Sequence, residues 1–269
     1  MSGGRRAWLV AACALAAAGA PPPAAFASPP PPIVRPADEA GMSAQELGRQ
    51  LFAANCSTCH GSRGEGVAAP QSGPTGPEGL GPPLIGVGRL ATDFYLRTGY
   101  MPLGDPHDQP ERSRVRLTDR EIRAVEDYVD SLGGKPGPPI PSPDPAAGNV
   151  SEGLQLFTEH CAGCHQVVAE GGVVTGARVP PLDSATATQI AQAVRIGPYV
   201  MPKFSTKDIS DAELNSIVRY VLYAQEPDDQ GGWGIDHLGP FPEGMVTWGI
   251  AAILLVGVCM LIGERLRRG

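Results

Sequence analysis

Two stretches of the chain repeat apolar residues every three or four positions, which is the spacing of one face of an α-helix. Each stretch opens with Thr or Ser followed three residues later by Glu, a pair that caps the first turn of a helix. These stretches begin at Thr118 and Ser210, and a similar pair at Ser43 predicts a third helix that runs toward Cys56. Gly133 and Gly134 are expected to end the first of them. The apolar faces comprise Ile122, Val125, Val129 and Leu132 in one helix and Leu214, Ile217, Val218, Val221 and Leu222 in the other.

The two ends of the chain have a different pattern. Residues 245–262 are 18 consecutive uncharged, mainly apolar residues, enough for a transmembrane helix, and three arginines follow in the tail 263–269. The positive-inside rule places this tail in the cytoplasm and the preceding body outside. At the other end, Arg5 and Arg6 precede a short apolar run, and the small residues before Ser28 predict an export signal over 1–27.

The segment around Cys56 occurs twice. Residues 48–60 and 153–165 are identical at seven of thirteen positions, and each is followed by Pro-Pro-Leu, then Met-Pro, then one of the capped helices. This order predicts a duplicated domain, with a stiff Pro-rich linker between the copies. We call residues 43–134 the first copy and 149–226 the second copy. The remaining segments are a Pro-rich leader over 28–42, the linker over 135–148 and a juxtamembrane segment over 227–244.

The composition and charge of the chain argue against some classes of fold and function. The chain has 269 residues, of which 35 are Gly and 29 are Pro, so much of it is loop and a large sheet is unlikely to form. Its formal net charge is -7, and because five of its 21 basic residues lie at the two ends, the body between them is more acidic than the whole chain. Because nucleic-acid binders need a basic surface, the acidic body argues against that class of partner.

The chemistry lies in two Cys-x-x-Cys-His motifs, which match the pattern for covalent attachment of c-type haem. Two thiols on one turn can each form a thioether with a haem vinyl group, and the adjacent His can bind the iron. A zinc site, a dithiol redox site and a structural disulfide are the alternatives. Zinc needs four ligands and the Cys pairs lie in separate copies, so we favour haem. The motif residues are Cys56, Cys59 and His60 in the first copy and Cys161, Cys164 and His165 in the second.

A Met follows each motif and is the candidate sixth iron ligand. Met101 and Met201 each lie in a Gly- and Pro-containing segment, between a helix-compatible stretch and the closing helix. Thioether ligation is the pattern of electron-transferring haem c, although a Met in a core is often only a filler. Each copy has about 90 residues and few aromatic ones, so we expect haem to form much of its core.

These motifs resemble the class I cytochrome c family, once over residues 43–133 and again over 151–225. The resemblance implies a mostly α fold of two tandem cytochrome c domains and one C-terminal transmembrane helix. It also implies that a proline carbonyl after each motif accepts a hydrogen bond from the axial His. The matching prolines are Pro82 for His60, within Gly-Pro-Pro-Leu, and Pro180 for His165, where Val179 replaces the Gly.

The order of signal, two haem domains and one membrane span is similar to the dihaem cytochrome c subunits of actinobacterial cytochrome bc complexes. That resemblance implies two covalent haems c and an electron-transfer subunit of quinol-cytochrome c reductase, with no quinol chemistry on this chain. It further implies a Rieske iron-sulfur subunit, a cytochrome b subunit and a terminal cytochrome oxidase as partners.

Other functions would use the same residues. A stand-alone membrane-tethered electron shuttle, or a cytochrome subunit of another dehydrogenase or oxidase, differs only in its partners. A dihaem peroxidase would need an open iron position, and Met101 and Met201 argue against one.

Overall fold

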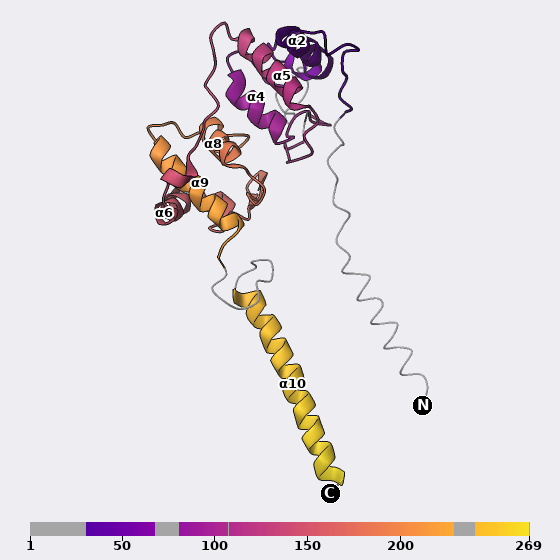
Figure 1. Ribbon diagram of the computed structural model, residues 1–269, viewed down its shortest axis with the longest axis vertical. Coiled ribbons are helices and arrows are strands. Elements are labelled where there is room, and N and C mark those ends of the chain that lie inside the picture. Colours follow the sequence, from indigo (N-terminus) through magenta and orange to yellow (C-terminus); the bar gives the residue numbers. More distant parts are fainter. Residues whose placement is uncertain (1–30, 68–80, 107, 229–239, 269) are drawn as a thin grey trace, which may run out of the picture. The chain divides into compact units, whose positions relative to one another are not determined.

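The computed structural model describes residues 31–67, 81–106, 108–228 and 240–268, and it is mostly helical (Figure 1). The chain divides into two compact units, which are described here one at a time. The first unit comprises the chain up to Pro141 together with Gln192–Lys203, and the second comprises Ser142–Ala191 and the chain from Phe204 onward. The predicted export signal over 1–27 lies outside the described residues.

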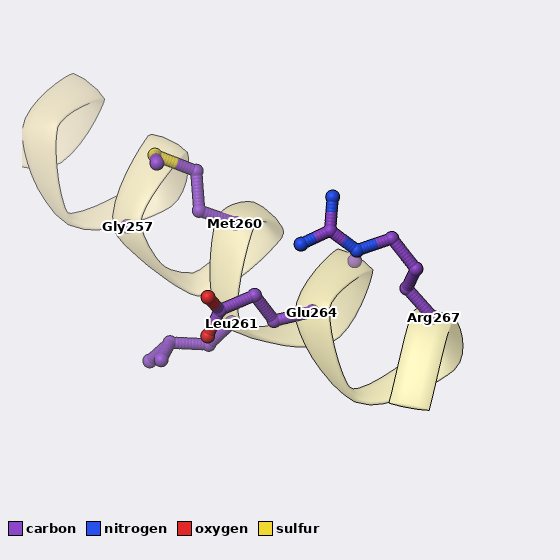
Figure 2. A pocket seen from close by; sticks show the side chains of 6 residues that line it. Gly257, Met260, Leu261, Glu264 and Arg267 are labelled. Atoms are coloured by element: carbon purple, nitrogen blue, oxygen red, sulfur yellow. The ribbon is translucent and has the colours of Figure 1, made fainter. Parts of the chain in front are cut away.

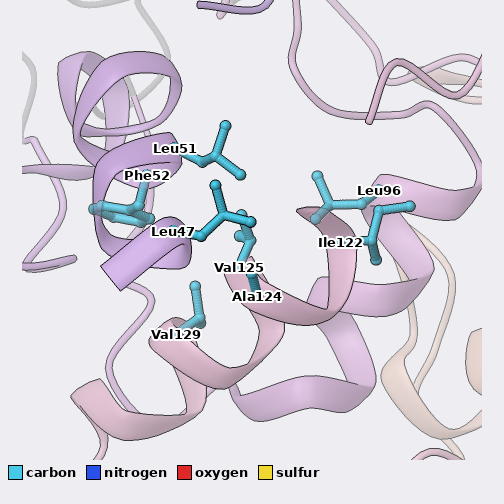
Figure 3. Packing of buried hydrophobic residues seen from close by; sticks show 8 residues of the cluster. All are labelled: Leu47, Leu51, Phe52, Leu96, Ile122, Ala124, Val125 and Val129. Atoms are coloured by element: carbon cyan, nitrogen blue, oxygen red, sulfur yellow. The ribbon is translucent and has the colours of Figure 1, made fainter. Parts of the chain in front are cut away.

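The described residues of the first unit up to Pro141 form the helices α2 (Ala44–Asn55), α3 (Ser57–His60), α4 (Gly88–Arg97) and α5 (Asp119–Leu132). Helix α5 packs against both α2 and α4. Figure 3 shows apolar side chains from these three helices that gather into one core. Its buried members are Leu47, Leu51, Phe52, Leu96, Ile122, Ala124, Val125 and Val129.

The second unit repeats the α2–α5 pair as α6 (Val150–His160) against α9 (Asp211–Gln225). It also contains η1 (Pro145–Ala147), α7 (Ala162–His165) and an antiparallel hairpin of β1 (Gly172–Val174) and β2 (Ala177–Val179). Helix α8 (Ala187–Ile196) begins in this unit and its last residues belong to the first. The hairpin was not anticipated from the sequence.

One glycine in each copy sets how closely the paired helices approach. A Cβ added to Gly48 in α2 would lie 1.9 Å from the Ala124 carbonyl oxygen in α5. The equivalent Gly153 in α6 would place a Cβ 2.0 Å from the Ser216 carbonyl oxygen in α9. No side chain fits at either position, which explains why this residue is Gly in both copies of the repeat.

The capping signals in the sequence are confirmed. The Ser43 side chain accepts a hydrogen bond from the Glu46 N–H at the start of α2. Both α5 and α9 begin with a complete capping box, from Thr118 and Ser210 respectively. Helix α5 ends at Leu132, followed by Gly133, as expected. These local bonds satisfy N–H groups that the first turn of a helix would otherwise leave unpaired.

The leader is fastened to the first unit. The Asn55 side chain pairs with the backbone of Val34, accepting from its N–H at 2.7 Å and donating to its carbonyl at 2.9 Å. Next to it, the Arg35 guanidinium binds both carboxylate oxygens of Glu121, whose side chain is 1% exposed. Residues 31–37, which we call the strap, are therefore part of the folded unit.

Helix α10 (Pro240–Arg268) is the last element of the second unit, and it is the one helix in the described residues that is long and apolar enough to cross a membrane. Large apolar side chains from Met245 to Leu266 are exposed along it. Exposure of so many large apolar groups suits contact with lipid rather than water.

Candidate haem sites

The first Cys motif lies on the turn where α2 passes into α3. Cys56 caps the end of α2, and its carbonyl accepts from the N–H of Cys59 at 3.2 Å and from that of His60 at 2.9 Å. A single helical turn therefore presents both thiols and the imidazole. The second motif repeats this turn, with the Cys161 carbonyl accepting from Cys164 at 3.1 Å and from His165 at 2.9 Å.

The orientation of the His60 ring fixes which nitrogen is free. Nδ1 lies 2.8 Å from the Pro82 carbonyl oxygen, which can only accept, so Nδ1 carries the proton. The lone pair of Nε2 is then free to bind a metal ion, and the hydrogen bond holds the ring in place. Gly81 allows this approach, because a Cβ there would lie 2.6 Å from the Cys59 carbonyl oxygen.

His165 is held differently. It is 9% exposed, and its Nδ1 has no hydrogen bond of good geometry, although the Pro180 carbonyl is near enough to act on it. Burial lowers the pKa of His165, outweighing the opposite effect of the Pro180 carbonyl. The ring is therefore neutral at physiological pH and keeps a lone pair for a metal ion.

The replacement of Gly81 by Val179 in the second copy has a compensating change. In the first copy Val67 forms a bridge with Gly81, and in the second Gly172 pairs with Val179. Each pair contains one Gly and one Val, on opposite strands. The second copy thus keeps the ladder beside its Cys motif and extends it into the β1–β2 hairpin.

Met101 lies against the core of the first unit. It packs on the same apolar cluster as Cys56 and Leu84, so the structure brings the candidate sixth ligand and the first thiol of the motif to one core. Gly99, at φ +70°, turns the chain after α4, and the Met101 N–H donates to the Tyr95 carbonyl at 3.1 Å. Met201 lies within the segment Gln192–Lys203 of the first unit, and its pairing with His165 stays a prediction.

The first thiol of each motif is shielded from solvent, which weighs against a zinc site or a dithiol redox site. Burial raises the pKa of Cys56 to about 12 and that of Cys161 to about 11, whereas zinc ligands and reactive dithiols need accessible thiolates. All the cysteines that the structure describes are free, so neither motif forms a disulfide. Among the described residues, no three His, Cys, Asp or Glu side chains come together as a metal site.

Helix α10 carries a shallow hollow near its C-terminal end. Figure 2 shows it bordered by Met260, Leu261, Glu264 and Arg267, beside the bare backbone of Gly257. All of these residues belong to one exposed helix, and the hollow is not enclosed by a second element. We therefore do not regard it as a binding site.

Both copies of the repeat match known protein families. A cytochrome c family model matches residues 45–133, and a model of subunit III of cbb3-type cytochrome c oxidase matches residues 148–221. The cytochrome bc1 complex cytochrome c subunit of Corynebacterium diphtheriae is 34% identical over 252 residues, which are 86% of this chain and 85% of the relative. The chain belongs to this family of cytochrome c subunits.

Further relatives agree with that assignment. The cytochrome bc1 complex cytochrome c subunit of Mycobacterium tuberculosis is 34% identical over 86% of this chain and 82% of its own. The cbb3-type cytochrome c oxidase subunit CcoP of Azospirillum sp. is 31% identical over 65% of this chain and 60% of its own. The expected fold class, mostly α with two cytochrome c domains and a C-terminal membrane helix, is confirmed. Cytochrome c domains indicate covalently bound haem c.

Two groups of residues were missed by sequence reasoning. The strap was read only as a Pro-rich leader, and nothing local to Val34 or Arg35 signals their distant partners Asn55 and Glu121. A buried polar cluster at Asp93 was missed as well, because charged residues in a helix are normally solvent-exposed. An acidic residue on the apolar face of α4 was the available signal.

Proposed function

We propose that this chain carries electrons out of a quinol-oxidising cytochrome bc complex through two covalently bound haems c, one in each copy. The observation that supports this most strongly is the repeated turn, with two thiols followed by a His whose second nitrogen is free. When bound, the haem iron alternates between ferrous and ferric states and so accepts and releases single electrons.

The residues have separate roles in this proposal. The thiols would hold the porphyrin through thioethers, while His and Met would be the protein ligands of the iron. Pro82 and Pro180 orient the His rings. The assignments are Cys56, Cys59, His60 and Met101 for one haem and Cys161, Cys164, His165 and Met201 for the other.

The axial Met ligands also determine what the chain does not do. A Met bound to each iron would leave no open position for peroxide or carbon monoxide, so the chain would transfer electrons and perform no peroxidase chemistry. Quinol oxidation would occur on the partner subunits. This chain is then the electron-transfer subunit of quinol-cytochrome c reductase.

The partners follow from the position in the complex. A cytochrome b subunit and a Rieske iron-sulfur subunit would supply electrons, and a terminal cytochrome oxidase would receive them. Helix α10 would anchor the chain in the membrane, with the arginines after residue 262 in the cytoplasm and both units outside. The relationship to cytochrome bc1 subunits and to an oxidase subunit supports this chain of partners.

The test is a reduced-minus-oxidised spectrum of the tagged chain, purified gently from its native membranes, with haem c and haem b quantified. We expect two haems c per chain, accompanied by b-type haem from the partner. Replacing Cys56 and Cys59 by Ser should remove one haem c, and replacing Cys161 and Cys164 should remove the other.

Cys259→Ser is the matched control, because this thiol lies within α10, away from both motifs. It should leave the haem content unchanged. Recovery of haem c without any b-type haem in mild detergent would favour the tethered shuttle instead. A haem content that neither double variant lowers would overturn the assignment of the motifs.

A further inference from the structure

Three polar side chains are buried together in the first unit. Asp93 of α4, Glu126 of α5 and Gln192 of α8 are 5%, 3% and 0% exposed. One Asp93 oxygen accepts from the Gln192 side-chain amide at 2.6 Å, and the other accepts from Arg97. The Glu126 carboxyl hydrogen-bonds to Asp93, while one oxygen each of Glu126 and Gln192 has no partner.

The charges around this cluster favour a proton on Glu126. Burial and the neighbouring Asp93 raise the pKa of Glu126 to about 8, although Arg97 and Arg89 of α4 act in the opposite direction. Arg89 is already paired with Asp127 at 2.6 Å and with Asp130 at 3.6 Å, both on α5. Gln192 contributes no charge. At neutral pH, Glu126 therefore keeps its proton and donates it in a hydrogen bond to the Asp93 carboxylate.

The second copy shows that the fold does not require this cluster. Matching Arg97 to Arg195 aligns Asp93 with Ala191, and matching the two capping boxes aligns Glu126 with Val218. Ala191 and Val218 are both 0% exposed, so the same interior positions are apolar there. A buried carboxyl pair is costly compared with apolar packing. What the first unit has in addition is its contact with Gln192.

Gln192 begins a segment that leads to a candidate haem ligand. Residues Gln192–Lys203 belong to the first unit and contain Met201. A second link joins the Tyr95 hydroxyl of α4 to the Tyr199 backbone. Gly197, at φ +65°, turns the chain so closely that a Cβ would lie 2.6 Å from the Lys203 nitrogen. Movement of this segment would therefore move Met201.

We propose that Asp93, Glu126 and Gln192 form a proton-operated latch that holds the Met201 segment in place. The latch rests on the proposed function only in taking Met201 as a haem ligand. While Glu126 holds its proton, one negative charge is buried and Arg97 balances it. Loss of that proton leaves two carboxylates facing each other away from water, and their repulsion releases Gln192 and loosens the segment.

The direction of the pH dependence follows from the proton. Because the pKa of Glu126 is higher in the folded chain than the ordinary 4.5, the folded state binds this proton more tightly. The latch is thus fully closed below the ordinary pKa of Glu and opens as the pH rises through about 8. Acidification below neutrality leaves it closed.

The first test measures the latch without reference to haem ligation. Backbone hydrogen exchange over residues 192–203 is compared at matched pH between the full chain and its Glu126→Gln variant, which cannot lose a proton. From about one pH unit below to one above the Glu126 pKa of about 8, the ionised fraction rises about tenfold. The ratio of wild-type to variant exchange should rise by a similar factor.

Glu46→Gln is the matched control, since it makes the same substitution at an exposed carboxylate of α2 that pairs with Arg49, and it should behave as the wild type. A double variant, Asp93→Ala with Glu126→Val, copies the second copy and should show no rise even if Glu126→Gln folds poorly. An exchange ratio that stays flat, or a Glu126→Gln variant that responds as the wild type does, would overturn the latch.

The second measurement concerns the ligand. The charge-transfer band of Met-ligated ferric haem should lose its Met201 contribution over the same pH range in the wild type and keep it in Glu126→Gln. Met201→Ala identifies that contribution. If Met201→Ala leaves the band unchanged, the proposed ligand is wrong, and the exchange data still decide whether the latch exists.

Discussion

The two copies share the turn that presents two thiols and a His, and they differ in what surrounds it. In the first copy the strap pairs with Asn55, directly before Cys56. In the second the equivalent residue is His160, whose ring lies 6.0 Å from that of Phe204. A single bridge beside the first motif becomes the β1–β2 hairpin beside the second.

This comparison separates two kinds of constraint. The Cys-x-x-Cys-His turn and the helix pair that supports it are kept in both copies, down to Gly48 and Gly153. The supporting contacts are replaced freely, as polar pairs in one copy and apolar or aromatic ones in the other. Changes to the shared parts should therefore affect both copies alike, and changes to the others only one.

Removing the haem attachment should have the largest effect. Cys56→Ala with Cys59→Ala should leave the first unit unfolded, because its core packs on Cys56 and would lose the macrocycle. Far-ultraviolet circular dichroism should show a corresponding loss of helix. The pair Cys161→Ala and Cys164→Ala should do the same to the second unit, and a native spectrum from either variant would contradict the role of haem as core.

Loss of a Met ligand should come next. Met101→Ala and Met201→Ala should each lower one midpoint potential by on the order of 100 mV, a part of the roughly 0.8 V range that axial ligands control. Each should also let carbon monoxide bind one reduced haem. Potentiometric titration followed by absorbance distinguishes the two haems. An unchanged titration would remove that Met from the ligand set.

Gly48 and Gly153, where the paired helices cross, should both be intolerant of substitution by a larger residue. Gly48→Ala and Gly153→Ala each force a Cβ against a backbone carbonyl, and we expect destabilisation of about 1–3 kcal/mol in both. Denaturant titration of each holoprotein measures this. Gly163→Ala is the control, because nothing lies within 4 Å of the added carbon. A harmless Gly153→Ala beside a damaging Gly48→Ala would show that the helix pairs are not equivalent.

Cutting the strap should have the smallest effect and spare the second unit. Arg35→Ala removes the partner of a buried Glu121 and should cost about 1–2 kcal/mol, reduced by the partial exposure of Arg35. Burial alone would raise the pKa of Glu121, but its bonds to Arg35 and Thr118 lower it. The difference from wild type should therefore be present at neutral pH and shrink as the pH falls through that lowered pKa.

Thermal unfolding followed across pH checks this prediction. Arg49→Ala is the control, since Arg49 pairs only with an exposed Glu46, and it should change little. A pH-independent loss in Arg35→Ala would mean that the strap acts through packing and not through Glu121.

Local signals in the sequence were sufficient for the haem turn and the capped helices. The capping boxes at Thr118 and Ser210 and the Cys-x-x-Cys-His spacing determine their own geometry within a few residues. The contact between His60 and Pro82 was expected from the family resemblance, and the distance agrees with it. The role of Met201 stays a prediction.

What could not be predicted depends on partners far along the chain. The strap needs Glu121, 86 residues after Arg35, and the buried Asp93 needs Gln192, 99 residues later. The β1–β2 hairpin could not be predicted, because the Gly and Pro residues around it favour loop. Only the pairing of β1 with Val179 and its neighbours in β2 identifies the two strands. The hydrophobic pattern and the residue propensities predict only local backbone structure. Contacts between residues far apart in the sequence cannot be predicted from them.

The first unit is discontinuous, since it takes in Gln192–Lys203 from beyond the whole first half of the second copy. A chain synthesised from its N-terminus therefore cannot finish its first unit until most of the second copy has also been made. We expect the two haem-bearing units to mature together rather than in the order of their synthesis. A truncated chain that stops after the first copy would lack Gln192, the partner of Asp93, although it would contain every residue of that copy.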